Sequence, residues 1–492
     1  MAEKESQSIH AEMVDEAALP VADKGELVQL DAAAEKALVR KIDLHLLPPL
    51  FVLYMCAFID RVNIGNARIQ GLEKDLNMTG SDYNIALFMF FIPYITLEFP
   101  SNVLLKRLRP SIYLPSLIIG WGIMTVCQGV TGSFAGLVVC RVLIGVFEAG
   151  FFPGMVYLVS MYYKRNELQW RLNILWSAAI ISGAFSGLLA YGLANMDGIA
   201  GYGGWRWIFI IEGIATVLIA AAAIFVLPDW PTTARFLSQS ERTLLEQRLG
   251  LDTGDRCRMD RWGKGTSKRV FGDIKIWLGV LMFLGVTTTN YAFAFFTPTI
   301  LKQLGWTSVR SQVMSIPIWV AAALAALGAA WFSDRMKHRY GFIVLGAAIT
   351  TIGYAILLAM HSVPVGARYF ALYTIVMGGY ITQPITIGWL NNNLSGHYKR
   401  AAGTALSVGL GNVSGIIGST VFLTREAPTY PTGFGVGLGL CWVTVAAATV
   451  LAWYIIRENR IRDNGGRDYR YELPEDEKGN LGDDHPSFRF ML

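Results

Sequence analysis

Four ionisable residues stand inside long apolar stretches, in a pattern that could handle a charged solute together with a proton. Asp60 and Arg61 are adjacent in one stretch, and Arg141 and Glu148 lie seven residues apart in another. An ionisable side chain costs about 3 kcal/mol or more inside a bilayer, so such residues are rare there and usually functional. Seven residues make two helical turns, which places Arg141 and Glu148 on one helix face about 10 Å apart. Gly145 lies between them, and we expect it to leave room for a ligand or a partner side chain.

The charges of this set suggest how a proton and an anion could be coupled. Two acids and two arginines sum to zero, which makes the group tolerable in a low-dielectric setting. Protonating one acid frees an arginine, whose planar guanidinium suits a carboxylate. We predict Glu148 and Asp60 as proton acceptors, and Arg61 and Arg141 as the residues that hold the anion. Asp60 and Arg61 are neighbours and point about 100° apart, one into a cavity and one toward another helix. The alternative is a static network of ion pairs that joins two helices.

Twelve apolar segments must position these residues, and each is long enough to cross the roughly 30 Å hydrocarbon core of a bilayer. They lie at 44–66, 83–104, 112–131, 134–162, 173–194, 206–227, 276–300, 311–332, 342–361, 368–391, 402–423 and 434–456. The chain of 492 residues is 53% hydrophobic and only 16% charged, whereas a soluble protein carries about 25% charged residues. This composition excludes a soluble enzyme, a disordered scaffold and a nucleic-acid binder. It predicts an all-α membrane protein with twelve transmembrane helices.

The two halves of the sequence repeat each other. Residues 183–187 align with 411–415, and Pro153 aligns with Pro384. Duplicated bundles with a site between them at the membrane midplane are a recurring plan of transporters. We therefore predict two pseudo-symmetric six-helix bundles.

All four buried charges belong to the first half, and the second half offers neutral polar and aromatic groups instead. We predict Asn290, Tyr291, Trp389 and Asn412 as its substrate-binding residues. A charged wall that faces an uncharged one is what a small ionised solute requires.

Basic residues in short loops predict the orientation, because such loops stay on the cytosolic side of a membrane. Examples are Lys106 with Arg107 and Lys399 with Arg400, which lie on the side of both termini. The predicted organisation is a cytosolic tail at 1–43 with no cleavable signal peptide, a bundle at 44–227, a cytosolic linker at 228–275, a bundle at 276–457 and a cytosolic tail at 458–492.

Three smaller features complete this picture. Asp334 and Arg335, in the loop after the eighth segment, are predicted to form a cytoplasmic gate. Asn77 begins the sequence Asn-Met-Thr, a sequon that we expect to face outside and to carry a glycan. The five cysteines are scattered, and no nucleophile–base pair, metal-ligand cluster or phosphate-binding loop stands out. We expect no enzymatic activity, no metal and no cofactor.

Several motifs resemble those of the major facilitator superfamily, and more narrowly its anion:cation symporter branch with the fungal allantoate and nicotinate permeases. The motifs are DRVNIGNA (60–67), PSN (100–102), RVLIGVFEAGFFP (141–153), GWRWIFIIEG (204–213), WLNNN (389–393) with Gly396, Lys399 and Arg400, GN (411–412) and REAPTY (425–430). The resemblance covers about 44–457 and implies the major facilitator fold, rocker-switch alternating access and proton-coupled movement of organic carboxylates. It also implies that Asp60, Arg61, Arg141 and Glu148 serve coupling and binding. The acidic residue that the superfamily has after its second helix is absent here, so the gate is better sought at Asp334.

Together, the residues and the resemblance predict a monomeric, proton-coupled importer of a small organic anion at the plasma membrane, with an internal organelle membrane left open. The anion would be a carboxylate or a ureide-like nutrient, and the partners would be this anion, a proton and the bilayer, without nucleic acid. One alternative is an exporter of an acidic secondary metabolite. The other is a non-transporting nutrient sensor, which would show saturable binding without flux.

Overall fold

The computed structural model describes residues 32–105, 107–252, 266–336, 338–395, 397–474, 477–478 and 481–492. Within these ranges the chain forms helices joined by turns and loops, and it contains no β-strand. Eleven helical segments of this described part are long and apolar enough to cross a membrane. They are α2 (Ala32–Ile69), α4 (Asp82–Leu105), α5 (Pro110–Val130), α6 (Phe134–Glu148) with α7 (Phe151–Ser160), α8 (Arg165–Ala194), α9 (Gly204–Val226), α12 (Ile274–Gln303), α13 (Ser308–Met336), α14 (Arg339–Leu358), α15 (Val365–Asn392) and α18 (Pro431–Asp463).

Two of the twelve predicted segments are broken helices, where the sequence led us to expect continuous ones. The segment at 402–423 forms α16 (His397–Gly411) and α17 (Val413–Thr420), which are separated by Asn412. The segment at 134–162 is interrupted between α6 and α7, directly after Glu148. Pro153 lacks the N–H that a continuous helix would use there, and a Cβ on Gly150 would overlap the Ser101 hydroxyl of α4. Both breaks therefore lie beside residues that were predicted to be functional.

The helix α2 begins twelve residues before the predicted segment. Its charged first turns are bonded to α8 and to α10 (Gln239–Asp252), which belongs to the linker between the halves. Glu35 accepts hydrogen bonds from Lys164 Nζ at 2.5 Å and from Arg248 Nε at 2.8 Å. Asp43 accepts one from Arg171 Nε at 2.6 Å. These ion pairs let the helix continue beyond its apolar part.

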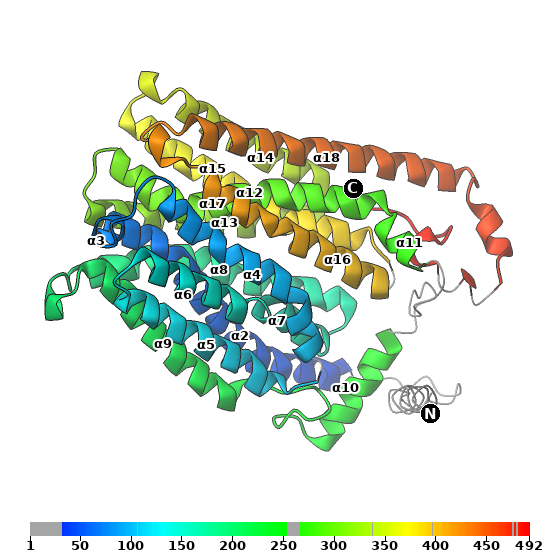
Figure 1. The fold of residues 1–492 in the computed structure, drawn as a ribbon. Helices are drawn as coiled ribbons and strands as arrows, with labels where there is room; N and C mark the ends of the chain where they lie inside the picture. The colour runs from blue at the N-terminus through cyan, green and yellow to red at the C-terminus, as the bar shows by residue number, and fades with distance from the viewer. Residues whose placement is uncertain are drawn as a thin grey trace, which may run out of the picture.

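The helices of each half pack mainly on one another, and the two halves meet chiefly where α2 lies on α12, α4 on α17 and α8 on α13 (Figure 1). Glycines allow close approach at these contacts, as in many membrane helix pairs. A Cβ on Gly65 of α2 would lie 2.5 Å from the Phe295 carbonyl oxygen of α12. A Cβ on Gly187 of α8 would lie 2.7 Å from Ser315 Oγ of α13.

The two ends of the molecule differ in how the halves are joined. The short helix α3 (Leu72–Asp75) lies at one end, and α10 lies at the other end with α11 (Thr266–Phe271) (Figure 1). At the α3 end, Lys302 Nζ and Ser308 Oγ both donate to the Ile69 carbonyl oxygen, at 2.8 and 2.7 Å. Asn84 Nδ2 also donates to the Phe422 carbonyl oxygen at 3.0 Å. These bonds join the two halves at the α3 end of the structure.

Candidate functional site

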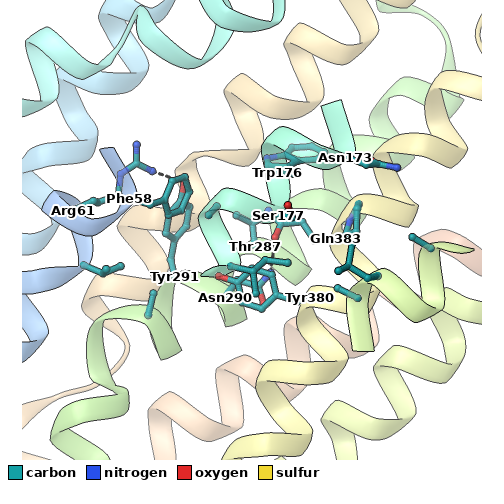
Figure 2. Close-up of a pocket in the computed structure, with 18 residues that line it drawn as sticks. Phe58, Arg61, Asn173, Trp176, Ser177, Thr287, Asn290, Tyr291, Tyr380 and Gln383 are labelled. Carbon is teal, nitrogen blue, oxygen red and sulfur yellow. Dashed lines mark hydrogen bonds between the residues drawn. The ribbon is translucent and has the colours of Figure 1, made fainter. Parts of the chain in front are cut away.

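A central cavity lies between the two halves and has two parts that share residues. Figure 2 shows the part between α2 and α8 of the first half and α12, α13 and α15 of the second. The other part reaches α4, α6, α7, α16 and Asn412, which lies between α16 and α17. The residues common to both parts are Phe58, Arg61, Trp176, Thr287, Tyr291 and Gln383. The cavity is therefore one space, lined from both halves.

Arg61 is the charged centre of this cavity. It is buried, and its Nη2 donates to Glu148 Oε1 in an ion pair between α2 and the end of α6. Its Nη1 donates to the hydroxyl of Tyr291 at 3.0 Å, across the boundary between the halves. The Tyr291 hydroxyl in turn donates to Asn412 Oδ1 at 3.4 Å. One chain of bonds thus joins a carboxylate of the first half to the helix break of the second.

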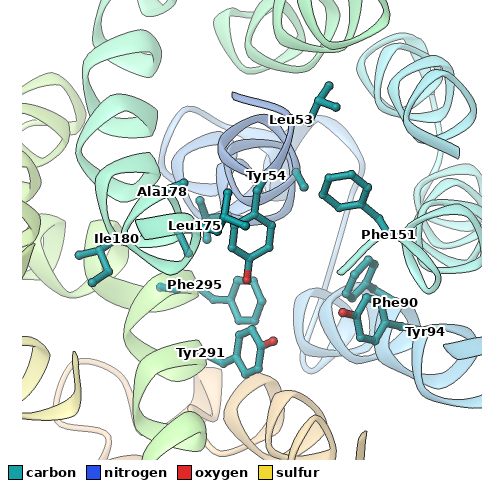
Figure 3. Packing of buried hydrophobic residues seen from close by; sticks show 14 of the residues in the cluster. Leu53, Tyr54, Phe90, Tyr94, Phe151, Leu175, Ala178, Ile180, Tyr291 and Phe295 are labelled. Atoms are coloured by element: carbon teal, nitrogen blue, oxygen red, sulfur yellow. The ribbon is translucent and has the colours of Figure 1, made fainter. Parts of the chain in front are cut away.

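Aromatic rings surround the Arg61 guanidinium. Its central carbon lies 5.0 Å from each of the ring centroids of Phe58, Phe90 and Tyr94, and 5.8 Å from that of Tyr291. Figure 3 shows Phe90, Tyr94 and Tyr291 in this group of buried rings. A cation over ring faces is favoured electrostatically, by about 0.5–2 kcal/mol per ring. The rings stabilise the charge of Arg61 without using all of its hydrogen-bond donors, and its Nε stays unpaired.

Asp60 points away from the cavity, as the rotation of a helix by one residue requires. Its Oδ2 accepts hydrogen bonds from Trp121 Nε1 at 3.1 Å and from Thr216 Oγ1 at 2.9 Å. These partners belong to α5 and α9, and Asp60 lines neither part of the cavity. The bonds fix the rotation of α2, which aims Arg61 at the cavity.

Arg141 is 1% exposed, and its Nε and Nη2 have no hydrogen-bond partner. It lies two turns from Glu148 on α6, outside both parts of the cavity. The expected space beside Gly145 is filled, because a Cβ there would lie 2.2 Å from the Phe90 carbonyl oxygen. The glycine brings α4 and α6 together and provides no ligand pocket. Arg141 is thus a buried cation without a committed partner.

The predicted neutral residues of the second half divide into two groups. Asn290, Tyr291 and Asn412 line the cavity, and Asn290 Nδ2 donates to Gln383 Oε1 at 2.7 Å. Trp389 does not reach it. The Trp389 indole is fully buried near the C-terminal end of α15 and donates to the Met491 carbonyl oxygen at 2.8 Å. The expectation that this ring binds a solute is not retained.

The predicted gate and glycan sites lie at the surface. Asp334 and Arg335 are exposed in the last turn of α13, where a loop was expected. Asp334 Oδ1 accepts a hydrogen bond from Arg339 Nη2 at 2.8 Å, which is a contact within the second half. Asn77 is exposed between α3 and α4, with a φ of 50°.

Several lining residues were not singled out from the sequence. The neutral polar ones are Asn173, Ser177, Thr287 and Gln383. Uncharged polar residues are common in membrane helices, so they give little signal on their own. The one available clue was the position of Gln383 directly before Pro384, which the internal repeat had already marked.

Comparison with known proteins identifies relatives of this chain. A family model described as Major Facilitator Superfamily matches residues 50–419. The MFS-type transporter cnsO of Penicillium expansum is 34% identical over 476 residues, which cover 94% of this chain and 91% of that protein. The major facilitator-type transporter hxnP of Emericella nidulans is 34% identical over 446 residues, which cover 89% of each chain.

A solved structure shares the fold at low sequence identity. The crystal structure of a D-xylose-proton symporter superposes with a TM-score of 0.62 at 14% identity. The match covers 85% of this chain and 97% of that one. The arrangement of helices described above is therefore the major facilitator fold that the sequence predicted.

Proposed function

This chain belongs to the Major Facilitator Superfamily, and on that premise we propose that it carries a small organic anion across a membrane together with a proton. Members of the superfamily are membrane transporters rather than enzymes, so the function of this chain is transport. The proposal adds the class of solute, the coupling to protons and membership of the anion:cation symporter branch. The proton symporter among the structural neighbours makes such coupling compatible with the fold.

The observation that carries the proposal is the Arg61–Glu148 ion pair in the wall of the central cavity. Both side chains line it, and the facing wall from the second half is uncharged. A buried ion pair is costly to desolvate and seldom improves stability over apolar packing. Its position beside a cavity favours a functional role over a purely structural one.

The pair provides a simple rule for coupling. When Glu148 takes up a proton, it no longer holds Arg61, and the guanidinium fork can bind a carboxylate in two hydrogen bonds. A proton and a monoanion then enter together, and the net charge of the site does not change. Because Arg61 also donates to Tyr291, binding of the anion alters a direct bond between the halves. Alternating access needs a coupling of this kind.

The remaining predicted residues have roles within this scheme. We propose Asp60 as a second proton acceptor, since its Oδ1 is buried without a partner, and Asn290 and Asn412 as neutral contacts of the solute. Arg141 lies toward the α3 end, where bonds join the halves, so it would meet the anion when these bonds part. We also propose Asp334 and Arg335 as part of the gate.

The placement in the cell is likewise a proposal. The α10 end carries basic loops such as the one at 107–109, and we assign it to the cytosolic side of the plasma membrane with both termini. Asn77 would then face outside and could carry a glycan. The predicted bundles, linker and tails, and the monomeric state, complete the proposal.

A thermal-shift screen of the purified chain against organic acids at pH 5 and pH 7 identifies the solute class first. Uptake of the best acid into proteoliposomes is then measured with and without an inward proton gradient. We expect Glu148→Gln to lose accumulation driven by the gradient while it keeps exchange of the anion. The matched control is Glu73→Gln, because Glu73 of α3 pairs with Arg68 of α2 outside the cavity, at 2.8 Å. Gradient-driven accumulation that survives in Glu148→Gln would refute the coupling role.

The same assay separates the alternative functions. An exporter of an acidic metabolite would deplete the labelled anion from cells that express the chain, whereas an importer would accumulate it. A sensor would bind the anion without any flux.

A further inference from the structure

The segment 481–492 lies against the α10 end of the second half and is bonded to it through its backbone. The Met491 carbonyl oxygen accepts hydrogen bonds from Trp389 Nε1 at 2.8 Å and Asn393 Nδ2 at 2.9 Å, and Met491 N donates to Asn393 Oδ1 at 2.8 Å. Arg339 N donates to the Leu492 carbonyl oxygen at 2.9 Å. Bonds to the backbone on both sides of one residue fix the path of a segment and do not arise from loose surface packing.

A buried charge network anchors the other end of this segment. Asp483 is fully buried, and its Oδ2 accepts hydrogen bonds from Lys275 Nζ at 2.6 Å and Lys399 Nζ at 2.9 Å. Asp273 contacts the same two lysines at 3.0 and 2.6 Å. Arg462 Nη2 of α18 donates to the Asp483 carbonyl oxygen at 3.0 Å. Two carboxylates thus hold two ammonium groups almost without exposure to water.

These bonds tie together the ends of helices that line the cavity. Lys275 is in the first turn of α12, which carries Tyr291, and Lys399 is in the first turn of α16. Trp389 and Asn393 are at the end of α15, which carries Gln383. The segment therefore pins the first turn of α16 to α12 and α15 at the α10 end.

The helix α16 is not continuous with the helix that follows it. Asn412 separates α16 from α17, so the part of α16 near the α10 end can bend without disturbing α17. To close the cavity at the α10 end, the first turns of α16 must approach the first half while the α3 end opens. The ion pair between Lys399 and Asp483 opposes this movement of α16.

We propose that residues 481–492 form a C-terminal clamp that holds α16 back and keeps the cavity open at the α10 end. Release of the clamp shifts the chain toward the state that is closed at this end. The clamp also gives a role to Trp389, Asn393 and Lys399, three motif residues that do not reach the cavity. It does not depend on the identity of the solute or on proton coupling.

The first half is held in a similar way at the same end, by ion pairs with α10 of the linker. Arg248 of α10 is fully buried, donates to Glu35 Oε1 at 2.8 Å and pairs with Glu167. Each half is thus held at its α10 end by one fully buried charged residue from outside its own spanning helices. The two halves differ in the helices that are held. Arg248 binds α2 and α8, which have no break at the cavity. Asp483 binds α16, which ends at the break at Asn412.

The test measures access to the cavity from the α10 end in the full-length chain. Ser177 lines the cavity from α8, so Ser177→Cys is introduced with Cys257→Ser and labelled with a membrane-impermeant maleimide. Asp483→Asn removes the central charge of the clamp, and Trp389→Phe removes one donor while keeping an aromatic ring. Asp484→Asn is the control, because Asp484 contacts Arg470 at 3.3 Å and takes no part in the lysine network. Hydrogen exchange of 481–492 reports whether the clamp is released.

We expect labelling to slow about three-fold or more in Asp483→Asn and Trp389→Phe, with faster hydrogen exchange of the segment, and no change in the control. Unchanged or faster labelling while the segment exchanges freely would overturn the clamp. A segment that stays protected in both variants would also overturn it, since these bonds would then not be what holds it. If Asp483→Asn does not fold, Trp389→Phe decides the question.

Discussion

Arg61 and Arg141, two buried arginines of the first half, should respond in opposite directions to the same substitution. Methionine keeps much of the length of an arginine and removes its charge and its donors. Arg61→Met removes one partner of the ion pair with Glu148. Arg141→Met removes a guanidinium whose Nε and Nη2 are buried without a partner.

The expected magnitudes follow from these surroundings. Loss of one partner from a buried ion pair costs about 3–5 kcal/mol, because the other charge is left uncompensated. Arg61→Met also loses the contacts with four aromatic rings. Removal of an unpaired buried polar group returns its desolvation energy, which is about 1–3 kcal/mol and larger for a charge. The two variants therefore change the stability of the chain in opposite directions.

Thermal unfolding of the purified chain in detergent, without added solute at pH 7, measures both effects through tryptophan fluorescence. We expect the midpoint to fall by several degrees in Arg61→Met and to rise by a few degrees in Arg141→Met. Arg141→Met should nevertheless lose stabilisation by organic acids, which would mark its charge as kept for function. If Arg141→Met unfolds at as low a temperature as Arg61→Met, Arg141 has a partner in the resting state and the reasoning fails.

Three further predictions come from individual contacts. Trp121→Phe leaves Asp60 with one donor fewer, so it should cost about 1–2 kcal/mol of stability by thermal unfolding and leave the response to organic acids intact; loss of that response would show that the bond between Trp121 and Asp60 is also needed to hold the anion. Gly65→Ala places a Cβ 2.5 Å from the Phe295 carbonyl oxygen and should push α2 from α12, which increases cysteine labelling from the α3 end; equal labelling would contradict this view of the interface. Burial alone would raise the pKa of Asp273, but its two lysine partners hold it below its usual value. Its stabilisation is therefore complete above the unfolded-state pKa of about 3.9 and is lost as the pH falls further. Hydrogen exchange of the C-terminal clamp, corrected for the intrinsic rate, should be constant from pH 8 to pH 7, because His485 of the segment, whose pKa is lowered by burial, takes up its proton only at lower pH. A change between pH 8 and pH 7 would contradict the assignment.

The spanning helices and the charged set were accessible from the sequence. The length and apolarity of a segment are local properties, so each predicted segment is helical in the structure. A charge inside such a segment is conspicuous for the same reason, which is how Asp60, Arg61, Arg141 and Glu148 were found. The breaks after Glu148 and at Asn412 were missed, because glycine and proline are tolerated in many continuous membrane helices.

The direction of each side chain could not be read in the same way. Asp60 and Arg61 are neighbours, and only the bonds from Trp121 and Thr216 decide which one faces the cavity. Trp389 looks like a ligand-binding aromatic residue, but a residue 102 positions later takes its indole N–H.

The sequence by itself determined that this chain spans a membrane in two repeated halves and that Asp60, Arg61, Arg141 and Glu148 lie inside helices of the first half. The tertiary structure decided that Arg61 and Glu148 meet at the cavity, that Arg141 has no fixed partner and that residues 481–492 clamp α16. The physical reason is the range of the interactions. Apolar length and buried charge are properties of one helix, whereas pairing, rotation and anchoring depend on residues that lie far apart in the chain and meet only when the helices pack.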